Sequence, residues 1–170
     1  ASKVPAGSDG LIILPHFMGA GAPEFDPHAK GIIFGLTLKH TKAHVIRAIL
    51  ESIAFMIRRN IELLEELGIR VEEIRSIGGA SRSPLWNQIK ANVISKQVIT
   101  LQMEEAASLG AAILAGVADG LFRSIEEGCK TMVKLKGKYE PQPEGREVYE
   151  KLYKVYCKLY DHVRDLFPLL

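Results

Sequence analysis

The stretch VEEIRSIGGASRSPLWNQ, Val71 to Gln88, decides the fold of this chain. A short apolar strand is predicted over Glu73 to Ile77, and the Gly78-Gly79 turn follows it directly. A helix is predicted from Ser83, because a serine can cap a backbone N–H and the proline after it suits the first helical position. Strand, turn and helix in this order indicate one unit of an α/β sheet.

The glycine turn is also the candidate binding site. Glycine has no side chain, so a ligand can reach the bare peptide N–H groups of Gly78 and Gly79. The helix that begins at Ser83 points its positive end toward the same place, and anions bind at such ends. The pattern therefore indicates a phosphate or nucleotide site, and a simple tight turn is the structural alternative.

Predicted strands and helices alternate on both sides of this stretch. Thr41 to Leu67 carries apolar residues at three- and four-residue spacing, which indicates a long amphipathic helix, and Gly68 ends it. Further strands are predicted over Leu11 to Leu14, Gly31 to Leu38 and Val98 to Leu101, and further helices over Ser83 to Ser95, Ser124 to Leu135 and Glu144 to Phe167, with an Ala-rich helix after Glu105. We therefore predict an α/β fold with a mixed sheet flanked by helices and extra C-terminal helices, in one domain over residues 1–170.

The last predicted helix carries two interleaved rows of residues. One row is aliphatic, and the other consists of Tyr149, Tyr153, Tyr156 and Tyr160. The aliphatic row is Val148, Leu152, Val155, Leu159, Val163 and Leu166. Aromatic residues at helical spacing are typical of a core or of an interface between chains, and both interpretations stay open.

Composition limits the function classes. Apolar residues make up 47% and charged residues 25% of the 170 residues, as in ordinary globular proteins. A formal charge of +2, with Lys and Arg scattered along the chain, argues against nucleic-acid binding. No apolar run approaches the ~20 residues that a membrane-spanning helix requires. Cys129 and Cys157 are far apart, which favours reduced thiols in a cytoplasmic protein. The chain opens without Met in loop-like sequence, so we expect it to be a piece of a longer protein.

Several polar pairs are candidate sites. His40 and His44 are four residues apart but have no third ligand nearby, which favours a helix start over a metal site. Glu24 and Asp26 lie in the glycine- and proline-rich segment His16 to Lys30, where a solvated loop is favoured over a catalytic pair. Glu104 and Glu105 precede a helix, where carboxylates favour the positive end, and a role beside a nucleotide is the alternative.

Four blocks of the sequence resemble the C-terminal part of the FGGY carbohydrate kinases. They are the Gly- and Pro-rich loop, GIIFGLTLKHTKAHVIRAILE (Gly31 to Glu51), the Gly78-Gly79-Ala80 turn with SPLWNQI, and EEAASLGAAILAG (Glu104 to Gly116). They stand in the order and at the separations that the family shows, and together they span nearly the whole chain.

The resemblance implies one lobe of an actin-like ATPase (ribonuclease H-like) fold, with ATP and sugar bound between two lobes. This chain is similar to the C-terminal lobe, which implies that Gly78, Gly79, Ala80 and Ser83 bind the nucleotide. Gln88 and Glu105 match family positions expected to support the turn. The catalytic Asp, most Mg²⁺ contacts and the sugar site are expected in the N-terminal lobe, so no catalytic or metal-binding residue is expected in this chain.

The expected function is transfer of the γ-phosphoryl group of ATP to a hydroxyl of a sugar or polyol, with a xylulose-like ketose the foremost substrate. These 170 residues alone are expected to be inactive. Two alternatives remain: a non-catalytic actin-like nucleotide switch, and a structural domain that pairs as a homodimer through the tyrosine-bearing helix.

Overall fold

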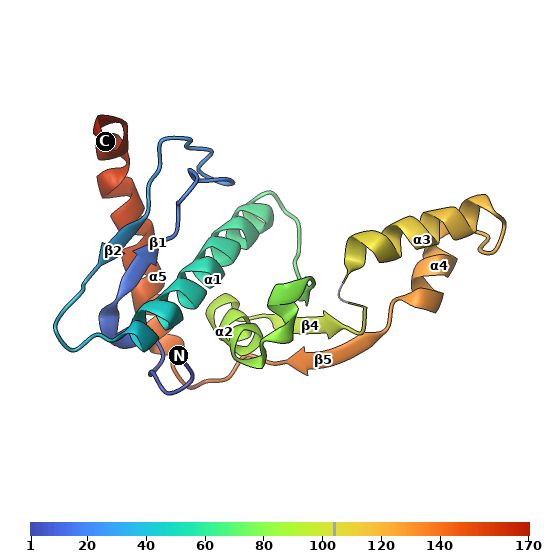
Figure 1. The fold of residues 1–170 in the computed structure, drawn as a ribbon, viewed down its shortest axis with the longest axis horizontal. Coiled ribbons are helices and arrows are strands. Elements are labelled where there is room, and N and C mark those ends of the chain that lie inside the picture. Colours follow the sequence, from blue (N-terminus) through green and yellow to red (C-terminus); the bar gives the residue numbers. More distant parts are fainter. Residues whose placement is uncertain (104) are drawn as a thin grey trace.

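The computed structural model describes residues 1–103 and 105–170 (Figure 1). Its helices and strands alternate along the chain, as the sequence predicts. The elements are η1 (Ser8–Gly10), β1 (Ile12–Leu14), β2 (Ile32–Phe34), α1 (Lys42–Glu66), β3 (Glu73–Ser76), η2 (Gly79–Arg82), α2 (Pro84–Ile94), β4 (Gln97–Leu101), α3 (Ala106–Ala118), α4 (Ile125–Met132), β5 (Leu135–Tyr139), α5 (Arg146–Val163) and η3 (Arg164–Leu169).

Two small sheets form within the described residues. β1 and β2 pair antiparallel, with Ile13 opposite Ile33. β4 lies between β3, which is parallel to it, and β5, which is antiparallel. The second sheet is therefore mixed, as predicted, and α2 packs against β4.

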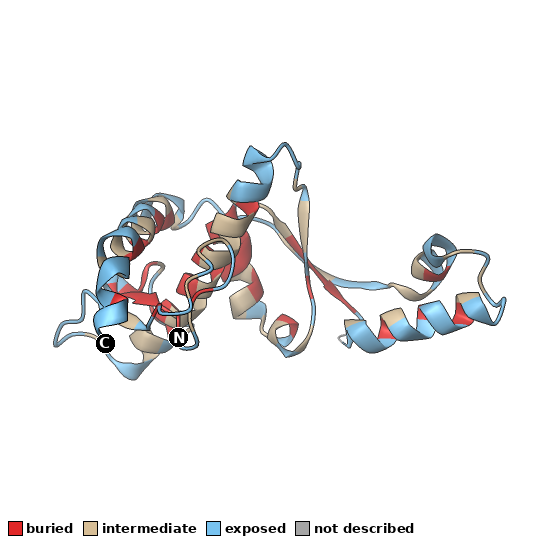
Figure 2. Cartoon of the chain, turned by 90° about the horizontal axis from the view of Figure 1, so that it is seen from above, coloured by how far each residue is buried: buried red, intermediate tan, exposed pale blue. Residues whose placement is uncertain are grey.

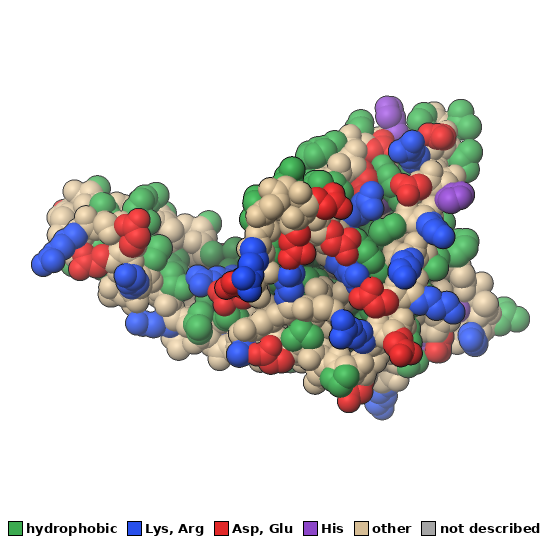
Figure 3. All heavy atoms as spheres, turned by 180° about the vertical axis from the view of Figure 1, so that it is seen from behind, with side chains coloured by type: hydrophobic (Ala, Val, Ile, Leu, Met, Phe, Trp, Pro, Cys, Tyr) green, Lys and Arg blue, Asp and Glu red, His purple; other side chains and the backbone are tan. Residues whose placement is uncertain are grey.

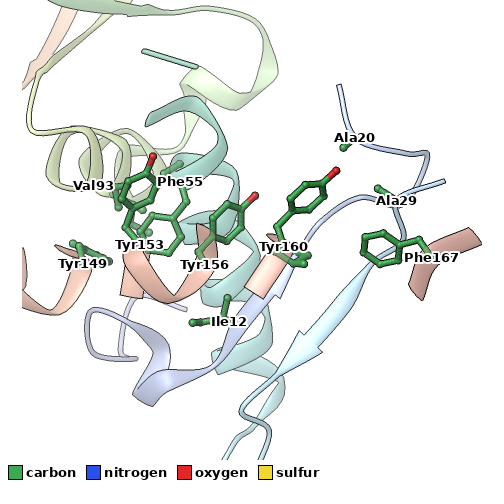
Figure 4. Close-up of a cluster of buried hydrophobic side chains, with 13 residues drawn as sticks. Ile12, Ala20, Ala29, Phe55, Val93, Tyr149, Tyr153, Tyr156, Tyr160 and Phe167 are labelled. Atoms are coloured by element: carbon green, nitrogen blue, oxygen red, sulfur yellow. The ribbon is translucent and has the colours of Figure 1, made fainter. Parts of the chain in front are cut away.

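The main core lies where α1 and α5 meet β1 and α2. Tyr149, Tyr153 and Tyr156 of α5 face Phe55 of α1 (Figure 4), and the centroids of the Phe55 and Tyr156 rings are 5.5 Å apart. All four tyrosines of the row are at least 93% buried, so their face of α5 is core and cannot serve as a pairing surface. The aliphatic row is less covered: Val148 is 42% exposed.

A buried ionic cluster fastens the N-terminal turn to this core. Glu51 of α1 is 2% exposed and accepts hydrogen bonds from the Gly7 N–H, the Ser8 hydroxyl and the Tyr149 hydroxyl. Arg47 Nε donates to the same carboxylate at 2.8 Å. Burial and the neighbouring Glu51 raise the pKa of Tyr149, which therefore stays protonated and donates.

α3 and α4 form an arm that projects away from the body, beyond the end of β4 (Figure 1). Most of the arm is exposed, whereas burial is concentrated in the body and along β4 (Figure 2). α3 and α4 pack on each other, and Gly128 of α4 lies where a Cβ would come 2.7 Å from Ile113 of α3. Acidic and basic side chains are interspersed over the face seen in Figure 3.

Several predicted boundaries need correction. The helix predicted over Ser124 to Leu135 ends at Met132, and residues 135–139 form β5, which the sequence did not predict. The strand predicted over Gly31 to Leu38 is confined to Ile32–Phe34. Gly35 ends it with a φ of +83°, where a Cβ would lie 2.7 Å from the Gly10 carbonyl oxygen, so only glycine fits this close approach.

Candidate nucleotide-binding site

The glycine turn leaves β3 with an open outer face. Gly78 has a φ of +70°, a left-handed conformation that glycine adopts without strain. A Cβ built on Gly78 or on Gly79 meets no atom within 4 Å, so no described side chain fills the space over the turn. Gly79 is exposed, and Gly78 and Ala80 are half-buried. A ligand can therefore approach the backbone here.

Two peptide N–H groups of this turn have no acceptor among residues 1–103 and 105–170. Gly79 and Ala80 are the first residues of the 3-10 turn η2, where no intrahelical carbonyl is available to them. The next N–H, that of Ser81, donates to the Gly78 carbonyl at 3.0 Å. Within the described residues neither the Gly79 nor the Ala80 N–H donates a hydrogen bond. Adjacent free N–H groups of this kind form a concave site for an anion.

α2 begins next to the turn, as predicted. Ser83 is its N-cap, and the Ser83 hydroxyl oxygen accepts from the Trp86 N–H at 3.3 Å, with Pro84 at the first helical position. The Ser83 side chain is thus engaged in capping. Its predicted contact with a nucleotide stays a prediction.

Asn87, which the sequence did not single out, holds the turn from behind. Its Nδ2 donates to the Ser81 carbonyl at 2.8 Å, and the residue is fully buried. Its Oδ1 has no partner among the described residues. An asparagine inside an apolar helix face was the available signal, because buried amides are usually there to satisfy backbone groups.

Lys90 is a second polar residue on the buried face of α2. Its Nζ donates to the Ser76 hydroxyl at 2.6 Å and lies 5.0 Å from the centroid of the Trp86 ring. Only 5% of the residue is exposed, and this burial lowers the pKa of its ammonium group. The same side of α2 is therefore attached to the end of β3 through Lys90 and to the turn through Asn87.

The two predicted supporting residues, Gln88 and Glu105, make no hydrogen bond to the turn among the described residues. Gln88 Nε2 donates to Asn92 Oδ1 and to the Glu140 carbonyl, which ties α2 to the chain after β5 and not to the turn. Glu105 is at the N-cap of α3, but its carboxylate makes no capping hydrogen bond. Glu104 lies outside the described residues. A role for Glu105 beside a nucleotide stays a prediction.

The turn and the start of α3 leave the same edge of the sheet. Ser76, the last residue of β3, is paired with Thr100 of the parallel strand β4. The segments after both strands therefore emerge together at the carboxyl edge, where ligands bind in open α/β sheets.

The other polar pairs have structural partners. His44 Nδ1 accepts from the Thr41 N–H at the start of α1, in agreement with a helix start. Glu24 pairs with Arg59, and Asp26 accepts from the Tyr160 hydroxyl. These two carboxylates therefore bind the loop to α1 and α5, which corrects the prediction of a solvated loop. Among residues 1–103 and 105–170 no group of three His, Cys, Asp or Glu side chains could hold a metal ion.

The fold and the turn define a class: an α/β lobe with a glycine turn at the carboxyl edge of its sheet. The profile of the FGGY family of carbohydrate kinases, C-terminal domain, matches residues 1–118. The chain belongs to the FGGY family of carbohydrate kinases, and its fold is that of an actin-like ATPase lobe.

The relatives carry the names of sugar and polyol kinases. The chain is 32% identical over 163 residues to the xylulose kinase of Bacillus subtilis, covering 96% of this chain and 33% of the relative. The structure of ligand-bound xylulose kinase from Lactobacillus acidophilus superposes with a TM-score of 0.86 at 30% identity, over 96% of this chain and 33% of that one. The structure of Plasmodium falciparum glycerol kinase with ADP superposes with a TM-score of 0.77 at 25% identity, over 91% of this chain and 31% of that one.

The chain thus spans about a third of the length of the relatives it matches. None of the helices that the structure describes has the length and apolarity needed to cross a bilayer.

Proposed function

We propose that this chain is the ATP-binding lobe of a carbohydrate kinase and that the nucleotide phosphates lie on the Gly78-Gly79 turn. The observation that supports this most directly is the open turn, whose Gly79 and Ala80 N–H groups have no acceptor in the described part of the chain. Peptide N–H groups at a helix start favour phosphate oxygens. The Plasmodium falciparum glycerol kinase was solved with ADP, which is consistent with a nucleotide in this fold.

The role of this lobe in the reaction is to position the nucleotide. Phosphoryl transfer depends on alignment of donor and acceptor and on neutralising charge, more than on covalent chemistry by the protein. The turn holds the inner phosphates, and α2, fixed by Asn87 and Lys90, keeps the turn in place. The sugar or polyol and the catalytic base belong to the other lobe, and closure of the two lobes excludes water.

Mg²⁺ is part of the proposal only as a companion of ATP. The described residues offer no cluster of three metal ligands, so they do not fit a protein-held metal site. In the proposal the ion is bound by phosphate oxygens and by residues outside this chain. When bound, it neutralises phosphate charge.

The proposed acceptor is a sugar or polyol, with a xylulose-like ketose foremost because of the two xylulose kinases reported above. A cytoplasmic location is part of the same proposal, and the two free thiols, Cys129 and Cys157, are compatible with a reducing compartment.

The test is a direct assay of the intact protein. Coupled ADP release is measured with ATP and a panel of pentoses, hexonates and polyols, and ATP binding is measured by calorimetry. Sugar-dependent ADP release supports the kinase. ATP binding without release on any acceptor favours the nucleotide switch, and no ATP binding at all overturns the proposal.

A further inference from the structure

Lys90 is a buried cation to which the described residues supply no carboxylate partner. It is 5% exposed, and its Nζ bonds to a neutral hydroxyl, that of Ser76, at 2.6 Å. The neighbouring Trp86 ring supplies only a weak cation–π contact, at 5.0 Å. In the part of the chain that the structure describes, no Asp or Glu pairs with this ammonium group.

Two other inner cations of the chain are neutralised by carboxylates. Arg47, 8% exposed, is paired with Glu51 at 2.8 Å. Arg58 is bound by Glu62 and by both carboxylate oxygens of Glu150. Burying a charge is costly unless an opposite charge or good hydrogen bonds compensate it. Lys90 differs from these two arginines because the described residues give it no counter-charge.

Lys90 lies close to the strand end from which the glycine turn leaves. Ser76, its hydrogen-bond partner, ends β3 two residues before Gly78. Two residues of extended chain span at most about 7 Å, so the ammonium group lies within about 12 Å of the turn. Asn87, one helical turn before Lys90 on the same side of α2, holds the turn itself.

We propose that Lys90 is a positioning residue for the nucleotide: its buried charge attracts the phosphates seated on the Gly78-Gly79 turn, and its bond to Ser76 fixes the strand end from which the turn leaves. This inference rests on the proposed function. With an effective dielectric constant of about 20, a charge about 12 Å away changes the affinity for one phosphate charge about tenfold. Adenosine has no phosphate charge, so this attraction does not affect its affinity.

The experiment compares charged and neutral ligands on the intact protein. Titrations with ATP, ADP and adenosine are carried out on the unmodified protein and on the Lys90→Met, Lys90→Gln and Lys90→Arg variants. The two neutral variants are expected to bind ATP and ADP about tenfold more weakly and adenosine within twofold of the unmodified protein. Lys90→Arg is expected to retain most of the affinity for ATP.

A Ser76→Ala variant is the matched control, because it removes the hydrogen bond and leaves the charge. It is expected to weaken ATP and adenosine alike, and by less than threefold. Equal losses for ATP and adenosine in the neutral Lys90 variants, or no loss of ATP affinity, overturn the inference while leaving the proposed function standing. If the unmodified protein binds neither ATP nor ADP, the proposed function fails as well. Thermal unfolding shows whether each variant folds. If Lys90→Met does not fold, the comparison of ATP with adenosine is made on Lys90→Gln, whose amide can still bond to Ser76.

Discussion

Replacing Gly79 with valine tests whether the Gly78-Gly79 turn binds a ligand or has only a structural role. The valine Cβ would meet no atom within 4 Å, and Gly79 is outside the left-handed region of φ. The folded chain therefore accommodates the side chain, and the expected change in the free energy of unfolding is less than about 1 kcal/mol. A seated phosphate, by contrast, would compete with the two valine methyl groups for the same space.

The expected loss of ATP affinity follows from the two free N–H groups, of Gly79 and Ala80. A hydrogen bond to a charged group contributes about 1.5–3 kcal/mol, so losing one of them costs about 2 kcal/mol, or about 30-fold in KM for ATP. Initial rates of the intact protein are measured with ATP varied and the acceptor saturating, and thermal unfolding is measured beside them.

Gly110→Val is the matched control. Gly110 lies in α3, and a Cβ there also meets no atom within 4 Å. Its KM for ATP is expected to stay within twofold of that of the unmodified protein. An unchanged KM in Gly79→Val, with the variant folded, would refute the placement of phosphate on this turn.

Three further predictions concern the rest of the chain. Glu51→Gln leaves Arg47 buried without its counter-charge and is expected to lower the free energy of unfolding, measured by urea titration, by about 3 kcal/mol. The double variant with Arg47→Met should recover part of this loss, and additive losses from the two substitutions would contradict the pairing. The pKa of Glu150 lies below its ordinary value of 4.5 because Arg58 donates to it, so this stabilisation is complete above pH 4.5 and is lost as the pH falls through the lower folded-state pKa. Glu150→Gln should therefore remove about 0.5 kcal/mol at pH 7, since the pair is partly exposed, and less at pH 3, as urea midpoints at the two pH values will show. The 170-residue chain by itself should bind ATP weakly and phosphorylate no sugar, and turnover by this chain alone would contradict the need for a second lobe.

Local sequence predicted the starts and ends of the central elements. α1 runs over Lys42–Glu66 with Gly68 after it in the left-handed conformation, and Ser83 caps α2 before Pro84. These features depend on a few neighbouring residues, because caps and left-handed glycines act within one helical turn. The open glycine turn was predictable for the same reason.

The elements that sequence missed depend on distant partners. β5 reads LKGKY, which is polar and mostly exposed, and it forms a strand because the free edge of β4 pairs with it. The tyrosine row of α5 could have faced a core or another chain. Its burial against Phe55 is decided by where α1 lies.

The candidate site divides in the same way. The sequence by itself determined the turn, the helix start and the family blocks, because each is a short run of adjacent residues. Only the tertiary structure decided that Asn87 bonds to the turn while Gln88 bonds to Asn92 and Glu140. It also decided that Lys90 is buried against Ser76 with no carboxylate partner among the described residues. The physical reason is that hydrogen-bond partners and burial are set by which faces of α2, β3 and β4 meet, and no single segment contains that information.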